Sequence, residues 1–483
     1  MGQGLRSCGC PTPASTVLGE SGAREARAPT VAPLAPVPVA GSGSGGAASW
    51  APPNAALVGS AGARLAARLD GSAGTSWLVA KGCAVRLTWS SSSDQLGLGT
   101  PPVTLPDVPS LPARVVQVAC GEAHTLLLAL DPAPRVFASG ANDYGQLGLG
   151  DTMPRRDVAR AFEVKALDKS ALIGGVTCGG NVSMAVSQRG DVWSWGCNHE
   201  SGVLGLGTMP VACVPTPTPI GHLRRKVRAV QAATTGWTSL CLTHLGAVFS
   251  WGGGFCGVHG HGHQEDEPTA KPLRDLSEVA VVQLATGPLH VLALSSMGEV
   301  FSWGRIAGAF GPEAQLQLTP KYIDALQGIR IVQIAAGREH NLALSEAGEV
   351  YGWGAHGAGA MGGVPKLADR TQLYSLVHKV ELGLGKVREI GCGQCHSLFW
   401  ATTTLESEEA LSHQRESNSL WICGQGTAPA PHPAMPQEQK NFSGGATMLR
   451  GGGLAGSSLT PHIGTPLKLT RVDVKRILDM MAS

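Results

Sequence analysis

Short runs of alternating apolar and polar residues, cut by glycines, recur through most of the chain. In the run Val281-Val-Gln-Leu-Ala-Thr286, bulky aliphatic side chains return at alternate positions, and Gly298-Glu-Val-Phe-Ser-Trp-Gly304 places such a run between two glycines. A period of two is the pattern of a β-strand with one buried face, and glycine permits the tight turns between strands. The pattern therefore predicts many short strands joined by turns.

Three motifs recur in phase along the chain. The first is a strand that ends in Gly-x-x-His, with glycine and histidine at Gly121 and His124, Gly287 and His290, Gly337 and His340, and Gly393 and His396. The second ends in Trp-Gly, at Trp195-Gly196, Trp251-Gly252, Trp303-Gly304 and Trp353-Gly354. The third is Gly-Gln-Leu-Gly-Leu-Gly at 145–150, with partial copies at 95–99 and 203–207.

The repeats form seven units with a period of about 50 residues, anchored at Gly74, Gly121, Gly179, Gly236, Gly287, Gly337 and Gly393. One small antiparallel sheet cannot bury both of its faces alone, whereas sheets stacked around an axis bury them against each other. We therefore predict an all-β fold, a seven-bladed β-propeller.

The linked motifs resemble the regulator-of-chromosome-condensation repeat family, which is known for seven-bladed propellers. The resemblance covers about 350 of the 483 residues. It implies either a protein-interaction propeller or an exchange factor for a Ran-type small GTPase that docks on chromatin. The family's exchange factors bear a basic tail, which the scattered Arg6, Arg24 and Arg27 do not provide, so a chromatin role is not expected.

The chain divides by composition into four parts. Residues 1–60 are rich in Ala, Pro, Gly and Ser and are expected to be a disordered tail, residues 61–426 hold the propeller, and residues 427–469 form a low-complexity linker. Residues 470–483 are predicted to form a short amphipathic helix, because Val474, Ile477, Leu478 and Met481 fall on one helical face. That face is a candidate partner-binding surface, and the alternative is a frayed tail.

Two segments complicate the propeller. Residues 50–59 faintly resemble the end of another unit and are a candidate strand for closing the ring, and the last unit carries an acidic insertion from about Thr402 to Asn418. A third segment, Val279 to Met297, imitates a membrane span because it lacks formal charge. It contains Gly287-Pro288 and follows the repeat, so we expect two strands there and no membrane span.

Composition supports a turn-dense β protein, with 66 glycines and 32 prolines and only 15% charged residues. The net charge of +2 favours neither nucleic acid nor an acidic surface as partner. The 12 cysteines occur in a long chain without a secretory signal pattern, so free thiols in a reducing compartment are expected.

Two motifs imitate cofactor sites. Cys392-Gly-Gln-Cys395-His396 has the spacing of a c-type haem attachment signal, but Cys392 and His396 occupy ordinary repeat positions. Cys256, His259, His261 and His263 are weak candidates for zinc ligands, although alternate side chains on an extended segment point apart. We expect no metal and no cofactor.

The recurrent histidines are expected to bond backbone groups at the blade turns, and the recurrent tryptophans to pack between blades. Gly337 is expected to need a positive φ. No nucleophile motif, zinc-protease motif or phosphate-binding loop occurs, so no bond-making enzyme is expected.

We therefore expect a protein-interaction propeller acting as a scaffold or regulator, with the Ran-type exchange factor as the alternative. Ultraviolet sensing, a third role in the family, is not expected because only Gly236-Trp-Thr-Ser239 remains of its Trp and Arg pattern. The expected compartment is cytoplasm or nucleus. An organellar transit peptide and acylation at Gly2, Cys8 and Cys10 remain alternatives for the N-terminal tail.

Overall fold

A computed structural model describes the chain over most of its middle and in short stretches outside it. The described residues are 68–72, 75–80, 83–88, 103–104, 115–130, 133–155, 161–167, 171–207, 211–311, 314–355, 361, 374–383, 385–393, 396–404, 416–424 and 470–472. All of them belong to one compact unit. The expected disordered tail, residues 50–59, the haem-like Cys395 and helix residues 473–483 lie outside the described residues.

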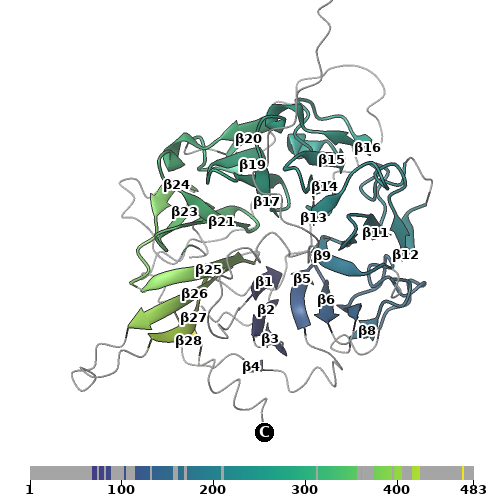
Figure 1. Cartoon of the computed structure of the whole chain (residues 1–483), viewed down its shortest axis with the longest axis horizontal. Helices are drawn as coiled ribbons and strands as arrows, with labels where there is room; N and C mark the ends of the chain where they lie inside the picture. The colour runs from purple at the N-terminus through teal and green to yellow at the C-terminus, as the bar shows by residue number, and fades with distance from the viewer. Residues whose placement is uncertain are drawn as a thin grey trace, which may run out of the picture. The chain divides into compact units, whose positions relative to one another are not determined.

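The described strands form seven four-stranded antiparallel sheets, each built from four consecutive strands (Figure 1). Sheets 1 and 2 contain β1 (Arg68–Ser72), β2 (Thr75–Ala80), β3 (Cys83–Thr88), β4 (Val103–Thr104), β5 (Val115–Cys120), β6 (His124–Leu130), β7 (Pro134–Gly140) and β8 (Phe162–Glu163). Sheets 3 and 4 contain β9 (Ile173–Gly179), β10 (Val182–Ser187), β11 (Val192–Cys197), β12 (Cys213–Pro219), β13 (Ala229–Thr234), β14 (Thr238–Thr243), β15 (Val248–Gly252) and β16 (Glu267–Pro272).

Sheets 5 to 7 continue the same order. They contain β17 (Val281–Thr286), β18 (His290–Ser295), β19 (Val300–Ala307), β20 (Ala314–Tyr322), β21 (Ile331–Ala336), β22 (His340–Ser345), β23 (Val350–Ala355), β24 (Tyr374–Lys379), β25 (Lys386–Cys392), β26 (His396–Thr404), β27 (Glu416–Gly424) and β28 (Thr470–Val472). Within the described residues, three short 3-10 turns lie between strands, at η2 (Phe255–Gly257), η3 (Arg274–Leu276) and η4 (Asp324–Leu326).

The first strands of the sheets meet in a closed ring. Each contacts the first strand of the next sheet, from β1 through β5, β9, β13, β17 and β21 to β25, which contacts β1 (Figure 1). The predicted all-β propeller is thereby confirmed. The segment that imitates a membrane span forms β17 and β18, and within the described residues no helix has the length and apolar character needed to cross a membrane.

The last sheet differs from its prediction. Its fourth strand, β28, comes from Thr470–Val472 and pairs with β27, so the propeller does not end at residue 426. The predicted helix is therefore wrong at its first three residues, because they complete the backbone hydrogen bonding of an otherwise open sheet edge. The predicted insertion is also shorter than expected, since Thr402, Thr403 and Thr404 pair with Asn418, Ser417 and Glu416.

The core lies between adjacent sheets. In one cluster, Leu126 and Val136 of sheet 2 pack with Val176 and Trp195 of sheet 3. Trp195, Trp251, Trp303 and Trp353 are all fully buried. Burying such side chains stabilises the sheet pair by about 1.5–3 kcal/mol for each large apolar residue, so the ring is held by contacts that no single sheet can make.

Antiparallel order gives the ring two faces. One, here called the turn face, carries the turns between first and second strands and the loops between third and fourth strands. The other, here called the connection face, carries the turns between second and third strands and the connections that lead from each fourth strand to the next sheet.

Candidate functional site

The recurrent histidines join neighbouring sheets. His124 Nε2 lies 2.8 Å from Ser183 Oγ, and His340 Nε2 lies 3.0 Å from Ser397 Oγ. His290 Nε2 lies 2.6 Å from Asn341 Oδ1. At Nε2, each ring thus reaches a polar side chain at the start of the next sheet's second strand, whereas a backbone group was expected. His340 also makes the expected kind of bond, to the backbone of His396.

These imidazoles are buried and neutral. Burial lowers the pKa of His124 and of His340 to about 3, and that of His396 to about 4. They stand at separate junctions around the ring, so they do not form one site.

The expected positive φ at Gly337 is wrong. A Cβ there would collide with the His340 ring and lie 2.7 Å from Gly393 O, so glycine is required for space. Positive φ occurs instead at the glycine of the Trp-Gly motif, for example +94° at Gly304.

The Gly-Gln-Leu-Gly element receives the tryptophan of the next sheet. Trp195 Nε1 donates to Gln146 O at 3.0 Å, Trp251 Nε1 to Val203 O at 2.9 Å, and Trp303 Nε1 to Val258 O at 2.7 Å. The histidine and tryptophan motifs therefore make contacts between sheets and do not assemble a reaction centre.

The weak zinc candidates lie closer together than expected. The ring centroid of His259 is 5.0 Å from that of His261 and 4.8 Å from that of His263. Their nitrogens nevertheless face different partners: His259 Nε2 donates to Glu265 O at 2.8 Å, and His261 Nε2 lies 3.0 Å from Ser250 Oγ. Within the described part of the chain, no group of these residues is arranged to hold a metal ion.

Of the haem-like motif, Cys392 and His396 are described, and both are buried. Burial raises the pKa of the Cys392 thiol to about 12. A buried thiol and a buried imidazole that belong to the repeat make no surface on which haem could attach.

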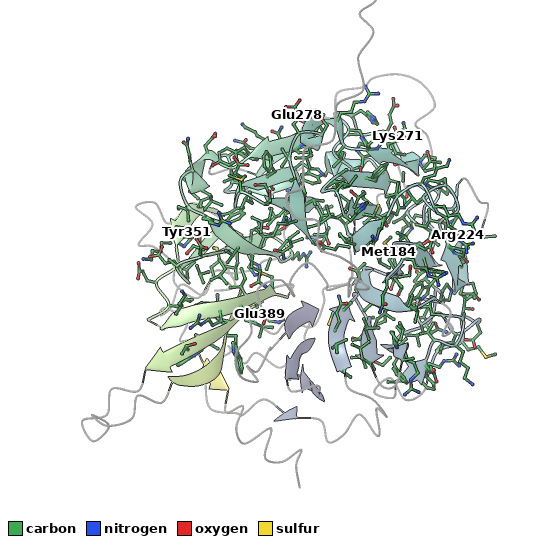
Figure 2. The ribbon with its side chains drawn as sticks, in the orientation of Figure 1. Met184, Arg224, Lys271, Glu278, Tyr351 and Glu389 are labelled. Carbon is green, nitrogen blue, oxygen red and sulfur yellow. The ribbon has the colours of Figure 1, made fainter. Side chains whose placement is uncertain are left out.

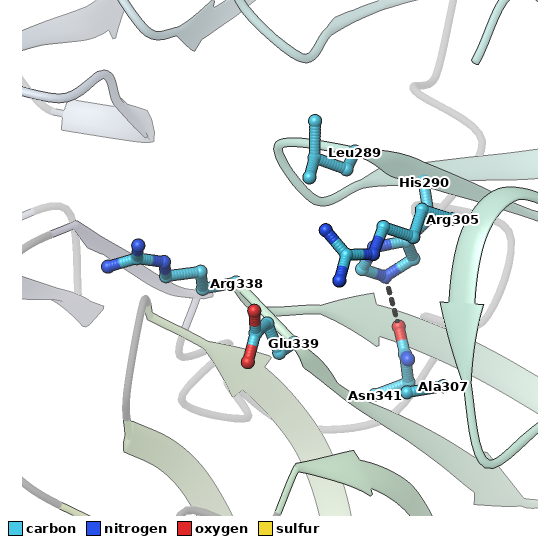
Figure 3. A pocket seen from close by; sticks show the side chains of 7 residues that line it. All are labelled: Leu289, His290, Arg305, Ala307, Arg338, Glu339 and Asn341. Atoms are coloured by element: carbon cyan, nitrogen blue, oxygen red, sulfur yellow. Dashed lines mark hydrogen bonds between the residues drawn. The ribbon is translucent and has the colours of Figure 1, made fainter. Parts of the chain in front are cut away.

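A small pocket opens on the turn face between sheets 5 and 6 (Figure 3). It is lined by Leu289, His290, Arg305, Ala307, Arg338, Glu339 and Asn341. Figure 3 shows the bond between His290 and Asn341 and the side chain of Arg338 directed away from it. The polar groups that line it are two guanidinium groups, one carboxylate, one amide and the buried imidazole of His290.

A patch of positive charge lies on the connection face, where residues 221–228 join sheet 3 to sheet 4. This segment, here called the basic connection, exposes Arg224, Arg225, Lys226 and Arg228. Figure 2 shows Arg224 at the periphery of the ring. Arg189, on the turn beside it, is also exposed. The turn and the connection are in contact, because Ala229 N donates to Gly190 O at 3.1 Å.

Only one of these cations has an ion pair within the described residues: Arg224 Nε lies 3.8 Å from Asp191 Oδ1. The neighbouring β14–β15 turn adds an apolar group, since Leu245 is 79% exposed and His244 N donates to Arg228 O at 3.0 Å. The patch therefore combines unpaired cations with one exposed aliphatic side chain.

The fold does not require this charge. Ile220 and Leu223 are buried and anchor the basic connection, as Leu273 and Leu276, and Ile323 and Leu326, anchor the next two connections. Those two connections carry charges of both signs, at Arg274, Asp275, Glu278, Asp324 and Arg330. The patch was not among the predicted sites, although four cations within five residues, at 224–228, are a visible signal in the sequence.

Comparison with known proteins identifies the repeat. A model described as "Regulator of chromosome condensation (RCC1) repeat" matches residues 135–186 and 189–242, and a second model of that description matches residues 331–359. The resemblance to this repeat family is thereby confirmed.

Among curated relatives, the human "Probable E3 ubiquitin-protein ligase HERC6" is 32% identical over 301 residues, which are 60% of this chain and 28% of that protein. The "Ultraviolet-B receptor UVR8" of Arabidopsis thaliana is 32% identical over 193 residues, 40% of this chain and 41% of that protein. Human "E3 ubiquitin-protein ligase HERC2" is 32% identical over 220 residues, 44% of this chain and 4% of that protein. The chain thus spans less than half the length of these relatives.

Two solved structures share the fold. Human WBSCR16 is 25% identical with a TM-score of 0.57, and the match covers 71% of this chain and 88% of that one. The Saccharomyces cerevisiae protein Prp20p, described with "Its Binding Properties to Gsp1p and Histones", is 24% identical with a TM-score of 0.55, covering 69% and 80%. The Prp20p match supports the propeller architecture only.

Proposed function

We propose that this propeller of RCC1 repeats is a non-enzymatic protein-binding scaffold whose partner binds the connection face at the basic connection. One observation carries the proposal. The buried anchor residues Ile220 and Leu223 have counterparts in the next two connections, whereas the cluster of exposed cations has none there. Exposed charge that folding does not need is available for a partner.

The chemistry of the patch favours an acidic protein segment. Arginine guanidinium groups bind carboxylates through paired hydrogen bonds, and the exposed Leu245 offers an apolar contact that a phosphate backbone would not use. The net charge of +2 also argues for a local contact rather than general attraction to polyanions.

Quantitative capture from native cells, after nuclease treatment, tests the proposal. It compares the wild type with Arg225→Glu/Lys226→Glu and with a control of equal charge change, Arg274→Glu/Arg330→Glu, on the two following connections. We expect at least one protein to be captured by the wild type and by the control but not by the test variant. The same proteins on all three baits would contradict the proposal.

Guanine-nucleotide exchange is the alternative function. It is supported by the likeness to Prp20p, a propeller described as binding Gsp1p and histones. An exchange factor works by binding the nucleotide-free GTPase more tightly than the loaded one. The scaffold function ranks first because it rests on exposed cations of this chain, whereas the exchange function rests on a likeness of fold. Cytoplasm or nucleus is the proposed location.

A further inference from the structure

Two cysteines face each other across one edge of sheet 3. Cys197 is the last residue of β11, Cys213 is the first residue of β12, and the strand register pairs them directly. Asn198 N donates to Ala212 O at 2.9 Å, so residues 198 and 212 form a hydrogen-bonded pair. The adjacent pair, 197 and 213, is then non-hydrogen-bonded, the arrangement in which opposite Cα atoms are about 4.5 Å apart. That separation lies within the span of a disulfide.

The two thiols have different surroundings. Cys197 is buried, and its Sγ lies 3.7 Å from His199 Nδ1, whereas Cys213 is only half-buried. The His199 ring stacks on Trp237 with a centroid separation of 3.9 Å, which fixes its orientation. Cys213 is therefore the thiol that meets an oxidant first, and Cys197 is the buried thiol placed to attack the oxidised Cys213 sulfur.

We propose that Cys197 and Cys213 form a redox modification site, at which hydrogen peroxide converts two thiols reversibly into a disulfide. Peroxide first oxidises the Cys213 thiol to a sulfenic acid and is itself reduced to water. The Cys197 sulfur then attacks the Cys213 sulfur, and the S–S bond forms as the hydroxyl group of the sulfenic acid leaves with the Cys197 proton as a second water. Two equivalents of a thiol reductant restore both cysteines and leave the reductant as its own disulfide.

The described cysteines offer no second pair of this kind. Cys392 and Cys423 are both buried and lie on β25 and β27, which β26 separates. Cys241 is fully buried on β14. At Cys197 and Cys213 the strand register places two thiols opposite each other, an imidazole lies nearby, and one sulfur is accessible. Within the described part of the chain, these three features occur together only there.

The disulfide would covalently close the loop between β11 and β12. This loop packs against sheet 4. The disulfide encloses residues 198–212, and Val203 in this loop accepts the hydrogen bond from Trp251 Nε1. Closing a loop removes conformations from the unfolded chain, so oxidation is expected to stabilise the folded chain.

Peptide mapping tests the site in the full-length protein. The reduced protein is treated with hydrogen peroxide, its remaining thiols are alkylated, and it is digested without reductant by trypsin and a Glu-specific protease. Cleavage after Arg189, Glu200 and Arg224 yields peptides 190–200 and 201–224, which stay together only through a bond between Cys197 and Cys213.

The expected result is a linked pair that dithiothreitol separates, that persists in the control Cys241→Ser and that is lost in Cys213→Ser. In Cys197→Ser, dimedone should label Cys213 as a trapped sulfenic acid. The oxidised wild type should melt a few degrees higher than the reduced protein, and Cys213→Ser should show no such rise. Absence of the linked pair, or a bond from Cys213 to another cysteine, would overturn the proposal. An unchanged melting temperature would contradict the claim that the disulfide stabilises the chain by closing the loop.

Discussion

The side-chain amide of Gln283 binds both backbone groups of Ile334 in the first strand of the next sheet. Its Nε2 donates to Ile334 O at 2.9 Å, and its Oε1 accepts from Ile334 N at 3.0 Å. Gln231 binds Leu284 in the same way, Gln117 binds Val176, and Gln333 binds Ile390. These glutamines form a network that extends backbone hydrogen bonding from sheet 2 to sheet 3, and from sheet 4 through sheets 5 and 6 to sheet 7.

Replacing Gln283 by Leu should therefore destabilise the propeller. The change leaves the N–H and C=O of Ile334 without partners at a partly buried position, at a cost of about 1–3 kcal/mol for each group that water cannot reach. Urea unfolding measures the loss, with exposed Gln327→Leu as the control. Equal stability of the two variants would show that the network contributes nothing.

Gly337→Ala should also destabilise the fold strongly, by several kcal/mol, because its Cβ would overlap the His340 ring and approach Gly393 O. Gly328→Ala is the matched control: Gly328 has a φ of +80°, but a Cβ added there would meet no atom within 4 Å, so only the backbone cost of about 1 kcal/mol applies. Thermal unfolding distinguishes the two costs. A milder effect at Gly337 than at Gly328 would refute the steric explanation.

Stability should fall between pH 7.5 and pH 5.5. The pKa values of His124 and His340 are lowered by burial to about 3 in the folded chain, whereas an unfolded histidine titrates near 6.5. The unfolded chain therefore binds protons first, and stability is lost as pH falls from 6.5 toward 3, by about 1.4 kcal/mol per histidine at pH 5.5. Urea unfolding at both pH values measures this, and His340→Gln should reduce the slope. A stability that does not change with pH would exclude neutral buried imidazoles.

Catalytic amounts of the chain should not accelerate release of fluorescent GDP from a Ran-type GTPase. A severalfold increase in the release rate, abolished by an excess of GTPase locked in its nucleotide-free form, would establish exchange activity and reverse the ranking of the two functions.

The sequence predicted the features that repeat locally. Alternation around Val281 and the glycines at Gly298 and Gly304 are short-range signals, and they predicted the strands and the propeller. The glutamines were visible at equal positions of the repeat, but their role depends on the register between sheets, which no single copy contains. The strand at Thr470–Val472 was missed because three residues beyond a long linker carry too little pattern to reveal that they complete an open sheet edge.

The candidate surface was missed for a related reason. The charge run at 224–228 is plain in the sequence, yet only burial separates the anchor Leu223 from the exposed cations beside it. Cys197 and Cys213 likewise lie opposite each other only because the strand register shifts between Ser194 and Gly196, and strand periodicity does not predict such a shift.

The most direct test of the scaffold function is the dissociation constant of the purified chain for the partner identified by capture, measured without nucleic acid. The protein-binding account predicts that Arg225→Glu/Lys226→Glu weakens binding at least tenfold, equivalent to about 1.4 kcal/mol, with an unchanged unfolding midpoint. The control Arg274→Glu/Arg330→Glu should bind within about twofold of the wild type, since its cations lie on connections of mixed charge. Equal dissociation constants for all three proteins would contradict a partner site at the basic connection.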